Sequence, residues 1–125
     1  MGGAETSLYN LVKRLNKDRY TPFVICPFFG TLAEKLQAHS ISTDIIPLPS
    51  WRKLKSILSR SSSLNQLINY AKTHSIDIVH SNTIWINNYA IRVSQKLNIP
   101  IVCHLRDLIS KGQIRKYQLD KADII

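Results

Sequence analysis

The chain has 125 residues, 44% of them hydrophobic and 20% charged, which suits one folded domain with a hydrophobic core. No apolar run reaches the roughly 18–20 residues that a membrane span needs, and the first residues lack the apolar segment of a secretory signal. The formal net charge of +9 indicates an anionic partner such as a nucleic acid, a membrane surface or a phosphorylated small molecule. A basic, solvated surface with no specific partner is an equally good explanation.

Helical and extended segments alternate along the chain, beginning with a helix. Residues 4–16 place Leu8, Leu11 and Leu15 at helical spacing, with Lys13 and Arg14 on the other face. Strands are predicted over residues 21–26, 43–48, 77–80 and 100–104, and further helices over residues 31–38, 64–74, 86–97 and 111–119. The alternation predicts an α/β fold: a Rossmann-like, three-layer domain with a mostly parallel sheet.

The stretch from residue 50 to residue 63 has the least regular pattern. Trp51, Leu54, Ile57 and Leu58 share one helical face surrounded by basic residues, and the serine run at residues 60–63 (RSSS) predicts a turn. Ser63 is then placed to cap the helix at residues 64–74. The basic, apolar helix either lies on an anionic membrane or packs on the sheet.

The two cysteines lie within apolar runs. Nothing near Cys26 or Cys103 has the spacing of zinc ligands, so we predict buried thiols, no metal site and a reducing compartment.

Both ends of the pattern differ from those of a complete domain. A Gly-Gly-Ala-Glu turn that opens a helix usually follows a β-strand, and residues 122–125 resemble a short fifth strand. We therefore expect a fragment that lacks its first, central strand. A small domain with frayed ends is the alternative.

An ordered set of motifs carries a family resemblance. Residues 2–5 (GGAE) precede an amphipathic helix, residues 76–81 read IDIVHS, residues 99–104 read IPIVCH, and residues 121–125 read KADII. The set resembles the N-terminal domain of the retaining GT-B glycosyltransferases, group 1 or family 4, over essentially the whole chain. The resemblance implies an acceptor-side domain, a separate C-terminal domain for the nucleotide-sugar that this chain lacks, and no cofactor. It also implies that the isolated chain is inactive.

The resemblance and the topology together predict a site. Open α/β sheets bind ligands at the carboxyl ends of their strands, where the strand order reverses. With strand order 3-2-1-4-5-6, one crevice there should be lined by Gly2, Gly3, His80, Ser81 and Asn82, with His104 one strand further along.

Glycine at positions 2 and 3 lets a ligand approach the backbone closely, and the helix that follows favours an anion. By resemblance, Gly2 and Gly3 face the donor diphosphate. The alternative is a tight turn that needs glycine for its conformation alone. The dinucleotide fingerprint Gly-x-Gly-x-x-Gly is absent, which disfavours a Rossmann-type dehydrogenase.

By resemblance, His104 is the candidate catalytic residue and contacts the transferred sugar; from the residues alone, a core histidine is the more usual interpretation. Many relatives have an acidic residue directly after this histidine, whereas here Leu105 and Arg106 precede Asp107. Arg106 suits a phosphate or carboxylate.

The polar residues His80, Ser81 and Asn82 suit acceptor hydroxyls, or else Ser81 and Asn82 only form a turn. The expected partners are a nucleotide-sugar, a glycan or lipid-linked acceptor and an anionic membrane, in the cytoplasm or at the inner membrane face. A basic anion- or nucleic-acid-binding module without catalysis remains the other hypothesis.

Overall fold

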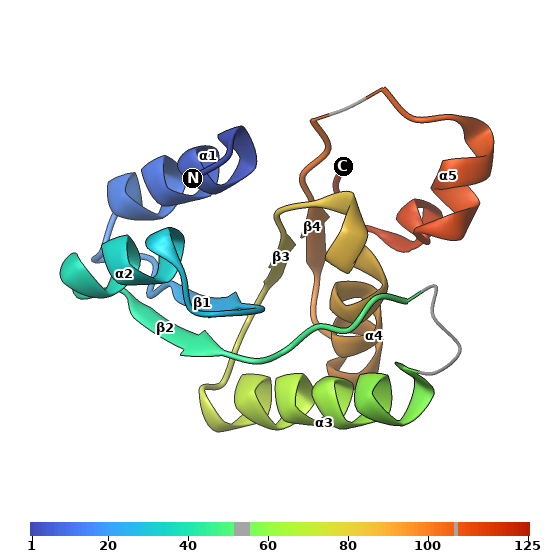
Figure 1. Ribbon diagram of the computed structural model, residues 1–125, viewed down its shortest axis with the longest axis horizontal. Helices are drawn as coiled ribbons and strands as arrows, with labels where there is room; N and C mark the ends of the chain where they lie inside the picture. Colours follow the sequence, from blue (N-terminus) through green and yellow to red (C-terminus); the bar gives the residue numbers. More distant parts are fainter. Residues whose placement is uncertain (52–55, 107) are drawn as a thin grey trace. The chain divides into compact units, whose positions relative to one another are not determined.

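A computed structural model describes residues 1–51, 56–106 and 108–125. The chain folds as two compact units, Met1–Pro47 and Leu48–Ile125. Each unit contains a pair of parallel strands joined through a helix (Figure 1). Parallel strands need such a crossover connection because the end of the first strand and the start of the second lie at opposite edges of the sheet.

The first unit contains α1 (Gly3–Arg14), β1 (Phe23–Cys26), α2 (Thr31–Ala38) and β2 (Ser42–Ile45). Strands β1 and β2 run parallel in register, from the pair Phe23 and Ser42 to the pair Cys26 and Ile45. Both helices contribute to one core with the buried face of β1, which comprises Val12, Val24, Cys26, Ala33, Leu36 and Ile41. This unit is therefore a βαβ element preceded by a helix that shares its core.

The second unit contains α3 (Ile57–Thr73), β3 (Val79–Ser81), α4 (Asn87–Leu97), β4 (Ile101–Cys103) and α5 (Lys111–Lys116). Short 3-10 helices, η2 (Ile84–Ile86) and η3 (Leu119–Lys121), precede α4 and follow α5. Strand β3 pairs with β4 in parallel, and Val102 of β4 also makes a parallel bridge to Ile124. The strand β4 therefore has neighbours on both sides.

Two hydrophobic clusters form the core of the second unit. One joins α4 and β4 to the segment around α5 and η3, through Ile91, Ile101, Cys103, Tyr117 and Leu119. The other joins α3 to α4 through Ile68, Ala71 and Val93. Helix α4 contributes to both clusters, so its opposite faces hold the unit together.

The predicted α/β class and parallel pairing are confirmed, and most predicted elements are present with shifts of a few residues. Helix α2 has both of its predicted ends, and Ile124 pairs with β4 as expected for a strand at residues 122–125. Both cysteines are buried free thiols, as predicted. Among the described residues, no helix combines the length and apolar character needed to cross a bilayer.

The predicted turn at the serine run is wrong. Helix α3 continues through it from Ile57 to Thr73, and Ser63 lies buried within the helix instead of capping one. The hydroxyls of Ser59 and Ser61 donate to the carbonyls of Ser56 and Ile57 one turn earlier, at 3.0 and 3.2 Å. These hydroxyls therefore bond to carbonyls of the same helix, and the chain does not turn between residues 60 and 63.

The apolar face predicted around Trp51 is not a core face. Ile57 and Leu58 are 53% and 86% exposed, Trp51 is half-buried, and Leu54 lies outside the described residues. The residues that α3 buries are instead Ser63, Ile68 and Ala71.

Candidate functional site

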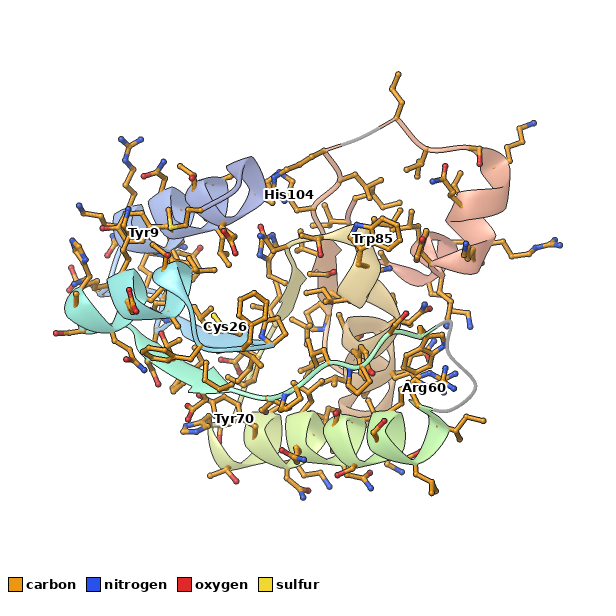
Figure 2. The ribbon with its side chains drawn as sticks, viewed as in Figure 1. Tyr9, Cys26, Arg60, Tyr70, Trp85 and His104 are labelled. Atoms are coloured by element: carbon orange, nitrogen blue, oxygen red, sulfur yellow. The ribbon has the colours of Figure 1, made fainter. Side chains whose placement is uncertain are left out.

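The carboxyl ends of β3 and β4 lie side by side in the second unit. The strand register pairs Ser81 with Cys103, and the backbone N–H of His104 donates to the Ser81 carbonyl at 2.8 Å. This pairing brings the imidazoles of His80 and His104 together, with their ring centroids 5.8 Å apart. Figure 2 labels His104 just beyond the end of β4.

A cavity of about 390 Å³ opens beside the two imidazoles. Its volume falls in the range of small-molecule sites, and it combines an apolar wall with two polar rings, as such sites usually do. It is lined by His80, Val102, Cys103, His104, Leu105, Ile124 and Ile125. Both histidines predicted to take part in the site therefore line the same cavity.

Arg106, which follows β4, is hydrogen-bonded to Asn82, which follows β3. Its Nη1 donates to the backbone carbonyl of Asn82, and its Nη2 donates to Asn82 Oδ1 at 2.7 Å. The same Nη2 lies 3.3 Å from Nδ1 of His104. The guanidinium thus contacts residues that follow β3 and β4 at once.

The pKa of His80 is lowered, mainly by burial and to a smaller extent by the nearby His104 and Arg106. The ring keeps part of its exposed surface, but neighbouring groups remove some of its hydration and add positive charge. Because the ordinary pKa of histidine is about 6.5, a lowered pKa leaves His80 neutral at pH 7. A neutral imidazole can accept one hydrogen bond and donate another.

Ser81 and Asn82 are used within the chain. Ser81 is 1% exposed, and its hydroxyl donates to the Thr83 carbonyl at 3.1 Å. Asn82 is buried and holds Arg106. The Ser81 hydroxyl thus takes part in a turn and Asn82 binds Arg106, while contact of these residues with acceptor hydroxyls stays a prediction.

The Gly2-Gly3 turn belongs to the first unit. Gly2 is extended, with φ −78° and ψ 172°, and its N–H donates to Glu5 Oε2 at 2.8 Å. Neither glycine has a positive φ, and a Cβ at either position would meet no other heavy atom within 4 Å. Neither backbone conformation nor packing within the unit requires glycine here.

The predicted crevice that joins Gly2 and Gly3 to His80 spans the two units, and it stays a prediction. Asp107 lies outside the described residues. Within residues 1–51, 56–106 and 108–125, no three histidine, cysteine or acidic side chains are grouped to hold a metal ion.

Two polar contacts next to β4, one buried and one part-buried, were not predicted. Asn87 is fully buried, donates to the Tyr117 carbonyl at 2.6 Å and accepts from the Cys103 thiol. Asp123 Oδ2 accepts from the Ile101 N–H at 2.8 Å, which fastens the final segment to β4. The sequence offers one indication of the second contact: Asp123 is a single polar residue among apolar ones, in Ala-Asp-Ile-Ile.

Comparisons with known proteins give a family from one family model and a fold from two solved structures. The family model described as Glycosyltransferase Family 4 matches residues 1–123. The crystal structure of Anabaena Alr3699/HepE in complex with UDP and glucose matches with a TM-score of 0.69 and 21% identity, covering 93% of this chain and 31% of that one. Acinetobacter baumannii MurG matches with a TM-score of 0.70 and 16% identity, covering 98% of this chain and 37% of that one. A search of curated proteins finds no match.

Proposed function

Because the chain belongs to Glycosyltransferase Family 4, we propose that it is the acceptor-side part of an enzyme that transfers a sugar from a nucleotide-sugar with retention of anomeric configuration. The observation that carries the proposal is the convergence of His80, His104 and Arg106 at the carboxyl ends of β3 and β4. Ligands of open α/β sheets bind at this edge. The bound UDP and glucose in the HepE structure support a nucleotide-sugar as the donor.

His104 supplies the contact to the transferred sugar. Its imidazole lines the cavity, where a ring N–H can donate to a sugar hydroxyl or to charge that develops at the glycosidic oxygen. His80 lies beside it as a neutral ring and serves as a hydrogen-bond acceptor for the incoming hydroxyl.

Gly2 and Gly3 face the donor diphosphate. The space beside both Cα atoms is open, which would let a phosphate approach the first turn of α1, where the Gly2 N–H now donates to the Glu5 carboxylate. The lack of any internal need for glycine supports a role in the close approach of a ligand.

The segment around α3 contacts an anionic membrane in the cytoplasm. Trp51 is in cation–π contact with Arg60 and Arg92, whose guanidinium carbons lie 5.2 and 4.9 Å from its ring centroid. Ile57 and Leu58 are exposed beside this basic cluster. Apolar side chains flanked by arginine suit the interface of an anionic bilayer.

This chain spans 31% and 37% of the two related structures, and we propose that the donor-binding half lies outside it. The isolated 125 residues should then have no transferase activity. The open reading frame that contains them should encode a second α/β domain with a pair of glutamates.

The test is to express that whole reading frame and assay a panel of nucleotide-sugars by mass spectrometry. His104→Ala should lower kcat by roughly 10²–10³-fold if the imidazole stabilises developing charge. Sugar transfer by the isolated chain would refute the acceptor-side assignment. Salt-sensitive binding of generic DNA with no transfer would support the basic binding module instead.

A further inference from the structure

The contact between Arg106 and His104 constrains the proton on the imidazole. A guanidinium has only donors and stays charged in proteins, so a nitrogen that faces it must offer a lone pair. Nδ1 of His104 lies 3.3 Å from Nη2 of Arg106. With Nδ1 as acceptor, the single ring proton of the neutral imidazole resides on Nε2.

The guanidinium is itself held in place. Nη1 and Nη2 both donate to Asn82, one to the backbone carbonyl and one to Oδ1 at 2.7 Å. Two bonds to one residue fix the plane of the fork, which a single point contact cannot do. Asn82 is buried, so the plane is fixed relative to the end of β3.

We propose that Arg106 is a positioning residue that, anchored by Asn82, holds His104 in its Nε2–H form with that N–H as the donor toward the ligand. A proton on Nδ1 would set N–H against N–H at this contact. The assignment also adds to the role expected for Arg106, because both terminal nitrogens of its fork contact Asn82 or His104. That the donor meets a sugar rests on the proposed function; the tautomer does not.

The first test is nuclear magnetic resonance of the ¹⁵N-labelled 125-residue chain above pH 7, with His104 assigned by its loss in His104→Gln. We expect Nε2–H alone, with the Nδ1 resonance shifted upfield as for a hydrogen-bonded acceptor. Arg106→Ala should shift Nδ1 downfield, and Arg106→Glu should place a proton on Nδ1 because a carboxylate only accepts. Arg115→Ala, an exposed arginine of α5, is the matched control.

A proton on Nδ1 in the wild-type chain would overturn the proposal without any variant. An unchanged Nδ1 resonance in a folded Arg106→Ala chain would overturn it as well. Both results come from the ¹⁵N resonances of His104 and not from activity, so they remain valid even if the proposed transferase function is wrong.

The second test uses transfer by the complete reading frame. Arg106→Ala should lower kcat by roughly 10–100-fold, as loss of an orienting partner typically does, with partial rescue by Arg106→Lys. In the His104→Ala background the same change should have no further effect, because its partner is gone. Additive losses would indicate a merely structural role and overturn the proposal.

Discussion

Asn87 joins three parts of the second unit through one buried side chain. It is the first residue of α4 and is 0% exposed. Its Nδ2 donates to the Tyr117 carbonyl after α5, and its Oδ1 accepts from the Cys103 thiol at the end of β4. Asn87→Ala removes both bonds and leaves a small cavity, so it should destabilise the unit beside the candidate site.

The size of the effect follows from the two contacts. Each hydrogen bond contributes about 0.5–1.5 kcal/mol net, and a thiol left buried without its acceptor adds a desolvation cost. With the cavity, the free energy of unfolding should fall by about 2–4 kcal/mol, a large part of the ~5–15 kcal/mol of a typical domain. Asn65→Ala, at an exposed position of α3, should change it by less than about 0.5 kcal/mol.

The assay is a urea titration followed by tryptophan fluorescence. The chain has two tryptophans, Trp51 and Trp85, and both lie in the second unit. The ring of Trp85 stands edge-on to Tyr117 with centroids 5.7 Å apart, so its emission reports on the segment that Asn87 holds. A midpoint for Asn87→Ala equal to that of Asn65→Ala, at unchanged slope, would refute the reasoning.

Three further measurements test other features. Gly3→Ala should keep or raise stability, by up to about 1 kcal/mol, because alanine is the better helix former and its Cβ meets open space, yet it should weaken donor binding in the complete enzyme. Lower stability would show a conformational need for glycine. The lowered pKa of His80 means that the unfolded chain binds the proton first, so stability should decrease as pH falls below about 6.5, and His80→Gln should flatten that decrease in pH-dependent melts. Burial raises the pKa of the Cys26 and Cys103 thiols, so both should react with a disulfide reagent slowly when folded and rapidly in urea; fast labelling at either would contradict its burial.

Local pattern was sufficient where neighbouring residues decide the structure. Helix α2 was predicted to the residue, because Pro27 ends the strand before it and Leu32 and Leu36 mark its apolar face. The serine run in α3 failed for the opposite reason. Serine has a weak helix propensity, and the packing that buries Ser63 decides the conformation there.

In the candidate site, too, local features could be predicted from the sequence and long-range contacts could not. That polar residues after β3 and β4 would meet followed from parallel pairing alone, since parallel strands end at the same edge of a sheet. The bond between Asn82 and Arg106 joins residues 24 positions apart, and that between Asn87 and Tyr117 joins residues 30 apart. Such contacts depend on side-chain reach across the folded unit, which no short sequence pattern encodes.

The unequal pairing of the second sheet has a practical consequence for handling the protein. Strand β4 is bonded on both sides, whereas the strand pairing of the described residues gives β3 a single neighbour. An edge with unpaired backbone groups is a template for strand addition, and purified protein should therefore self-associate as its concentration rises. The same edge is a route to complementation: a short synthetic peptide of strand-forming sequence, added in trans, should dock there, suppress the association and raise the melting temperature.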